Sequence, residues 1–189
     1  NQHPIHTDLL LLKSELHILD GNHDEATQLL SLIEEIDPNN QEIYIQKATI
    51  SSKNKKNKLA IEHLYKSLEF SDDPEEIWCL LAMEYMVLED YSKAKEYFQR
   101  CIESDPSDYQ VLYNLLYCLE YLEQPQEAIA VLNTVLELNP YNEIAWLESG
   151  KQQLHLGNKE AALNAFEFAI ISEDRFTGAY IEKGKLLTE

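Results

Sequence analysis

Residues 75–108 read EEIWCLLAMEYMVLEDYSKAKEYFQRCIESDPSD and contain two amphipathic stretches. Apolar residues recur in each stretch at spacings of three and four, the period of a helix that buries one face. They are Ile77, Trp78, Leu81, Ala82 and Tyr85, and then Ala94, Tyr97, Phe98 and Cys101. Glu89-Asp90 separates the stretches, and Asp105-Pro106 ends the second, because a residue before proline disfavours the helix. The segment therefore predicts two antiparallel helices joined by a short turn.

The same pattern returns along the chain with a period of 34 residues and no gaps, from starts at Thr7, Gln41, Glu75, Tyr109, Glu143 and Thr177. Nineteen residues after the first five starts stands an alanine each time: Ala26, Ala60, Ala94, Ala128 and Ala162. Three residues after every start stands a large side chain: Leu10, Tyr44, Trp78, Leu112, Trp146 and Tyr180. Small residues let paired helices approach closely, so the sequence predicts a stack of helix pairs.

This period resembles the tetratricopeptide repeat, a helix–turn–helix unit of the same length. The residues that carry the resemblance are Trp78, Leu81, Ala82, Tyr85, Ala94, Phe98 and Pro106, and then Trp146, Gly150, Ala162, Phe166 and Ala169. The resemblance implies an all-α fold, a right-handed superhelical α-solenoid. The first two periods depart from the pattern, because Lys13 and Lys47 stand where Leu81 and Leu115 stand later. Such a lysine fits if its stem packs and its ammonium group reaches water.

The period also predicts how the chain is divided. We expect residues 1–6 to be a leader from a longer chain, and the full repeats to span 7–40, 41–74, 75–108, 109–142 and 143–176. Residues 177–189 would form the first helix of a truncated sixth repeat. Its apolar edge would then be open for self-association, through Ile181, Leu186 and Leu187.

In proteins of the resembling family, the first helix of each pair lines a concave groove that takes extended or helical peptides. Transfer of these positions predicts a peptide-binding face of Met83, Met86, Tyr113, Tyr117, Tyr121, Leu147, Lys151 and His155. The three tyrosines are spaced by four and so lie along one side of a helix. Tyrosine and methionine are both common at protein interfaces. The alternative is that some of these side chains pack against neighbouring first helices as part of the core.

The charge of the chain excludes some partners. The sequence has 34 acidic and 15 basic residues, a formal charge of −19. It therefore lacks the basic surface that nucleic acids or anionic membranes require. Residues 59–150 hold 19 acids and 4 bases, so a partner with basic flanks would be steered there, unless these acids serve only solubility. We interpret the lysine-rich loop at residues 53–58 as solvated.

Catalytic and metal-binding motifs are missing from the sequence. It has no HExxH, no glycine-rich phosphate loop and no nucleophile elbow, and the histidines beyond the leader are isolated. We therefore predict a scaffold for protein partners that is not an enzyme and uses no cofactor or metal. The alternatives are a substrate-recruiting or regulatory segment of a larger enzyme, and a self-associating structural module. Three cysteines without a CxxC pair, Cys79, Cys101 and Cys118, predict buried thiols and a cytoplasmic location.

Overall fold

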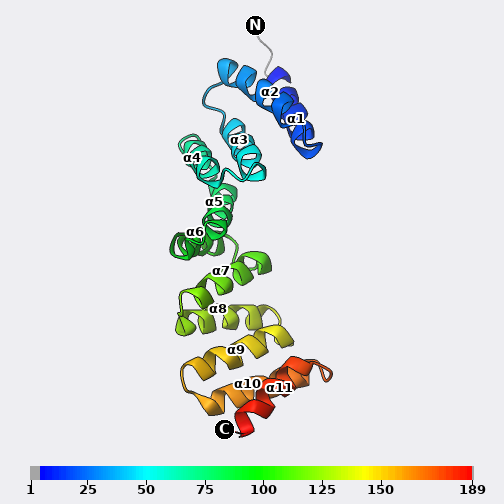
Figure 1. The fold of residues 1–189 in the computed structure, drawn as a ribbon, viewed down its shortest axis with the longest axis vertical. Coiled ribbons are helices and arrows are strands. Elements are labelled where there is room, and N and C mark those ends of the chain that lie inside the picture. Colours follow the sequence, from blue (N-terminus) through cyan, green and yellow to red (C-terminus); the bar gives the residue numbers. More distant parts are fainter. Residues whose placement is uncertain (1–4, 189) are drawn as a thin grey trace. The chain divides into compact units, whose positions relative to one another are not determined.

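The computed structural model describes residues 5–188, which form eleven helices and no strand (Figure 1). This confirms the all-α class predicted from the period. The chain divides into two compact units, the first ending at Asp90 and the second beginning at Tyr91. Among the described residues, no helix has the length and hydropathy that a membrane span requires.

Unit 1 holds five helices: α1 (Ile5–Leu19), α2 (His23–Ile36), α3 (Gln41–Lys53), α4 (Asn57–Leu68) and α5 (Glu75–Val87). One of its core clusters joins α1, α2 and α3 through Leu11, Ile18, Ala26, Leu30, Ile33, Ile43 and Ile50. Small residues meet inside the first pair, where the Ser14 hydroxyl donates to the carbonyl of Ala26 at 3.4 Å. Of the predicted leader, residues 1–4 lie outside the described part of the chain, and residues 5 and 6 belong to α1.

Unit 2 holds six helices: α6 (Tyr91–Ser104), α7 (Tyr109–Tyr121), α8 (Pro125–Leu138), α9 (Glu143–His155), α10 (Lys159–Ser172) and α11 (Thr177–Thr188). One core cluster joins α7, α8 and α9 through Leu112, Leu132, Val135, Leu136 and Ala145. A second joins α9, α10 and α11 through Leu147, Ala162, Phe166, Ala169, Ala179 and Leu186. Each helix thus buries its apolar stripe mainly against its neighbours in the chain, as expected of a repeat array.

Helix starts in both units are capped by side chains that follow from the sequence. Asn40, Asp108 and Asn142 precede α3, α7 and α9, and each accepts a hydrogen bond from a backbone N–H of the first turn. Such caps satisfy donors that have no partner within the helix. Each of these three residues lies two positions after the proline that follows the preceding helix. The chain therefore ends one helix and begins the next within a few residues.

The turn inside each helix pair has a left-handed residue. Positive φ angles occur at Gly21 (79°), Lys55 (59°), Glu89 (60°), Glu123 (53°) and Gly157 (76°), which are spaced by 34 residues. After each of them, the next backbone N–H closes a six-residue loop onto the preceding helix, as Gln124 does onto Leu119 at 2.9 Å. This is the Schellman ending of a helix, at which glycine is usual. The backbone therefore repeats even where the residue type does not.

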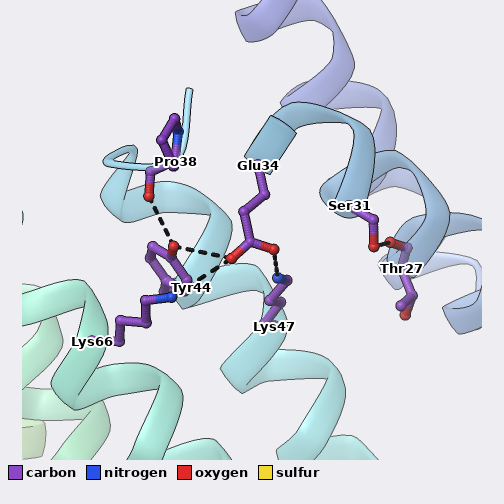
Figure 2. Close-up of polar contacts among 7 residues, drawn as sticks. All are labelled: Thr27, Ser31, Glu34, Pro38, Tyr44, Lys47 and Lys66. Atoms are coloured by element: carbon purple, nitrogen blue, oxygen red, sulfur yellow. Dashed lines mark hydrogen bonds and ion pairs between the residues drawn. The ribbon is translucent and has the colours of Figure 1, made fainter. Parts of the chain in front are cut away.

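A carboxylate on α2 ties three helices of unit 1 together (Figure 2). Glu34 accepts hydrogen bonds from Lys47 and Tyr44 of α3, and its carboxylate lies 3.7 Å from the ammonium of Lys66 on α4. The Tyr44 hydroxyl also lies 2.8 Å from the carbonyl of Pro38. The unusual Lys47 is therefore neutralised by Glu34, rather than held only by water as the sequence suggested. Charged hydrogen bonds of this kind exceed neutral ones in strength.

The cysteines depart from the expectation of three thiols. Cys118 is a free, buried thiol, and burial raises its pKa to about 11, so it is neutral near pH 7. Cys79 and Cys101 are both disulfide-bonded. The prediction is therefore wrong for these two residues, because sequence spacing alone does not reveal which side chains approach each other. The inference of a reducing, cytoplasmic compartment loses the support of the cysteine pattern.

Candidate functional site

A cavity of about 250 Å³ lies between α7 and α9 in unit 2. Its lining combines an apolar floor with an acidic and amide rim, and consists of Tyr113, Leu116, Tyr117, Glu120, Leu132, Ile144, Glu148 and Gln152. The floor residue Leu132 comes from α8, the second helix of the pair that α7 begins. Two predicted groove tyrosines, Tyr113 and Tyr117, therefore do lie together at a hollow.

Tyr113 is held in place by the start of α9. Its hydroxyl lies 3.0 Å from the side-chain nitrogen of Asn142, which donates to it, and the Asn142 oxygen accepts from the backbone N–H of Ala145 at 2.9 Å. Burial raises the pKa of Tyr113 above its ordinary value of 10.0, while the hydrogen bond to Asn142 opposes this shift. Tyr113 is thus a half-buried wall of the cavity, and it links α7 to the cap of α9.

Tyr117 and Tyr121 belong to a cluster of three aromatic rings on the surface of unit 2. The ring centroid of Tyr121 lies 4.5 Å from that of Tyr91 in a stacked arrangement, and 4.7 Å from that of Tyr117. Tyr91, the first residue of α6, also meets the edge of Tyr117, with 6.0 Å between centroids. Tyr117 and Tyr121 nevertheless remain 44% and 57% exposed. The cluster therefore holds the rings in place and still presents them to solvent.

A second hollow, of about 380 Å³, adjoins this cluster. It is lined by Tyr117, Glu120, Tyr121 and Glu123, so it shares Tyr117 and Glu120 with the α7–α9 cavity. Glu123 is the left-handed residue that closes α7. The two hollows thus form one continuous face along the C-terminal half of α7, which we call the tyrosine face.

The predicted residues on α9 have different positions. Leu147 is only 8% exposed and packs in the core with Phe166 and Ala179, so its assignment to the peptide-binding face is corrected. It is buried because α11 packs against α10 and covers that side of α9. The Lys151 ammonium pairs with Glu148 at 2.7 Å, and His155 is exposed at the end of the helix.

The two predicted methionines belong to α5 in unit 1. Met83 is 44% exposed and Met86 is partly buried. A cavity of about 230 Å³ in this unit is lined by Ala48, Thr49, Ser52, Lys53, Leu64, Leu80 and Glu84, and so by neither methionine. The predicted binding face is therefore distributed over both units, and its tyrosines line the two hollows of the tyrosine face in unit 2.

Several residues of the tyrosine face were not singled out from the sequence. Tyr91 was missed because it begins a different helix, and no spacing rule connects it to Tyr117. Glu120 was overlooked although it follows Tyr117 by three positions, a spacing that places both on one helix side. Leu132 and Ile144 come from α8 and α9, so only the packing of three helices shows that they share a cavity.

The electrostatic environment of this face is acidic. Residues 101–150 contain nine Asp or Glu and no Lys, Arg or His. Lys95 of α6 reaches the end of the α7–α8 turn, where its ammonium lies 2.7 Å from Glu127 and 2.8 Å from the side-chain oxygen of Gln124. Among the described residues, no group of three metal-binding side chains gathers anywhere. The face therefore offers aromatic, apolar and acidic groups.

Helix pairs that pack in succession define an α-helical repeat protein. Residues 75–108 and 109–142 each match a sequence profile of the tetratricopeptide repeat. No curated protein matches the chain in sequence. The fold is similar to that of YrrB, described as a tetratricopeptide repeat protein with an unusual peptide-binding site. The TM-score is 0.75 at 20% identity, covering 93% of this chain and 90% of that one.

It is also similar to MamA, with a TM-score of 0.74 at 19% identity, covering 89% of this chain and 92% of that one. The matches show that residues 75–142 are two tetratricopeptide repeats, and the chain as a whole has the fold of solved tetratricopeptide repeat proteins. Repeats of this family are modules for protein interaction, and the chain is accordingly an interaction scaffold.

Proposed function

We propose that this scaffold binds a peptide segment of a partner protein on the tyrosine face of unit 2. The observation that carries the proposal is the α7–α9 cavity, whose apolar lining consists of the buried Leu132, the partly buried Leu116 and the exposed Ile144. A leucine or phenylalanine of the partner that fills it would gain about 1.5–3 kcal/mol from leaving water. Such a gain is enough for one anchor residue to dominate the affinity.

The rim of the cavity supports binding of a peptide backbone. The Gln152 side chain can donate and accept hydrogen bonds, and the carboxylates of Glu120 and Glu148 accept them. The similar fold of YrrB, described with a peptide-binding site, is in line with this use of stacked helix pairs. The excess of acids around the face would speed association with a segment that carries basic residues.

Tyr117→Ala tests this proposal, since Tyr117 borders both hollows and leaves no core cavity when truncated. We expect partner capture from source lysate to fall, and the affinity for the captured partner to drop about tenfold, the effect of losing an interface hot spot. Tyr141→Ala is the matched control, because Tyr141 is 72% exposed and lines neither hollow. Equal affinity of the two variants, both with an unchanged helical spectrum, would exclude the tyrosine face.

Self-association is the second candidate function, and exposed apolar side chains favour it. α11 presents Tyr180, Ile181 and Leu187, while α1 presents Leu9, Leu12, Leu16 and Leu19. Leu186, which the sequence placed on the open edge, is buried in the core, so the edge is narrower than predicted. Light scattering of wild type and Ile181→Lys would show whether a dimer forms through α11. A segment that recruits a substrate for a larger enzyme would use the tyrosine face in the same way.

A further inference from the structure

The hollow beside the aromatic cluster has a composition distinct from that of the α7–α9 cavity. Tyr117 and Tyr121 supply two aromatic rings, and Glu120 and Glu123 supply two carboxylates. No leucine, isoleucine or valine lines it, whereas the neighbouring cavity has three such residues and Tyr113. An apolar side chain of the partner would leave these two carboxylates without a partner. The residues that line this hollow therefore favour a cationic group.

The rings are held in place before any ligand arrives. Tyr91 stacks on Tyr121 with 20° between the ring planes, and it also packs against Tyr117. Both tyrosines therefore lose little freedom when they bind, which reduces the entropic cost of association. A cation over a tyrosine ring is attracted by the negative charge of the ring face, and the attraction strengthens where water is excluded.

The carboxylates are available for a partner. Among the described residues, neither Glu120 nor Glu123 has an ion pair, and both side chains are exposed. Lys95 is already engaged by Glu127 and Gln124. Since residues 101–150 contain no cationic side chain, α7 and its flanking turns cannot neutralise the two acids themselves.

We infer that Tyr117, Tyr121, Glu120 and Glu123 bind an arginine side chain of the partner, next to the apolar residue that fills the α7–α9 cavity. This rests on the proposed function. A planar guanidinium stacks on tyrosine and donates two parallel hydrogen bonds to a carboxylate, which makes arginine a better fit than lysine. The recognised segment is thus a large apolar residue with an arginine near it.

The first test is a selection from a displayed library of random twelve-residue peptides. It is run on wild type, on Glu120→Gln/Glu123→Gln, and on the control Glu103→Gln/Glu137→Gln. The control removes two charges from α6 and α8 that are also exposed and line neither hollow of the tyrosine face. We expect wild type and control to select peptides with an arginine near a large apolar residue. The Glu120/Glu123 variant should retain the apolar preference and lose the arginine.

The second test measures affinity with one selected peptide made in two forms, with arginine or with citrulline. Citrulline keeps the shape of arginine and removes the charge. We expect the arginine form to bind wild type and control about five- to tenfold more tightly, the sum of one exposed cation–π contact and one ion pair. On Glu120→Gln/Glu123→Gln this ratio should fall to about twofold, because the rings remain.

The outcomes separate the two proposals. Selected peptides that bind the tyrosine face, as judged by loss of binding to Tyr117→Ala, but show no arginine preference would overturn the arginine site and leave the proposed function standing. An arginine preference of equal size in the Glu120/Glu123 variant would also overturn it. If wild type selects no peptide that depends on Tyr117, both the proposed function and this inference fail.

Discussion

Gly150 lies where a side chain of any size would collide with the ring of Phe166. A Cβ atom placed on this glycine meets three atoms of the buried ring, while one placed on Gly184, at the corresponding position of α11, meets nothing within 4 Å. The same position of the repeat, which holds a small residue, is therefore tightly packed on α9 and has free space around it on α11. Residue type alone does not distinguish the two positions.

This contrast gives a matched pair of variants. Gly150→Ala should destabilise the protein by about 1–3 kcal/mol, because Phe166 must move in a filled core. Gly184→Ala should stabilise by about 0.5–1 kcal/mol, since alanine loses less backbone freedom in a helix. Urea unfolding of both variants measures the difference. Shifts of equal sign would contradict the packing described for α9 and α10.

At the scale of the helix, the turns inside the helix pairs have the same backbone conformation although their residue types differ. Of the five left-handed positions, two are glycine and three carry long charged side chains. A left-handed conformation costs a residue with a Cβ roughly 1–2 kcal/mol. Three helix endings are therefore strained locally, and the packing of each helix pair compensates for the strain.

Relief of that strain should be measurable at the α3–α4 turn. Lys55→Gly is expected to stabilise the protein by about 1 kcal/mol, because glycine adopts the left-handed conformation without steric cost. Lys56→Gly serves as the control, since the preceding position is the one with positive φ. Thermal unfolding followed by circular dichroism compares the two. A lower midpoint for Lys55→Gly would argue against a left-handed residue there.

The Glu34 cluster adds a pH dependence at the same scale. The hydrogen bond from Lys47 is the main cause that lowers the pKa of Glu34 below its ordinary value of 4.5. A lowered carboxyl pKa adds stability above pH 4.5, and this contribution is lost as pH falls through the folded-state pKa. Glu34→Gln should therefore cost about 0.5–1 kcal/mol at pH 7, a small effect because the carboxylate is partly solvated, and less at pH 3, where the carboxyl group begins to be protonated.

Chemical denaturation at both pH values checks this expectation. Glu35→Gln is the control, because it makes the same charge change at the neighbouring, exposed position. A loss of equal size for both variants at pH 7 would mean that the Glu34 contacts add nothing specific. A loss for Glu34→Gln that is as large at pH 3 as at pH 7 would assign its role to packing rather than to charge.

For the whole molecule, charge is the dominant feature. With a formal charge of −19 on 189 residues, the surface carboxylates repel one another, and salt screens this repulsion. We expect the melting midpoint at pH 7 to rise by about 2–4 °C between 50 and 500 mM NaCl, equivalent to about 1 kcal/mol. Near the isoelectric point of about 4.6, the rise should disappear. A fall in the midpoint with salt at pH 7 would show that attractive ion pairs outweigh the repulsion.

The sequence by itself determined the helices, their pairing and the all-α repeat class. α3, α5, α7, α9 and α11 begin at Gln41, Glu75, Tyr109, Glu143 and Thr177, the residues that start each period. This was possible because amphipathic spacing and helix-ending prolines are local properties, and each repeat contacts mainly its neighbours.

Only the tertiary structure decided which groove positions are open. Leu147 and Tyr113 occupy the same position of the 34-residue period, yet α10 and α11 bury the first, while the second lines the α7–α9 cavity. The tyrosine face likewise depends on residues from different helices. Burial and contact depend on side chains many residues away in the chain. The 34-residue period shows only which residue types recur in each repeat, and so it does not predict these contacts.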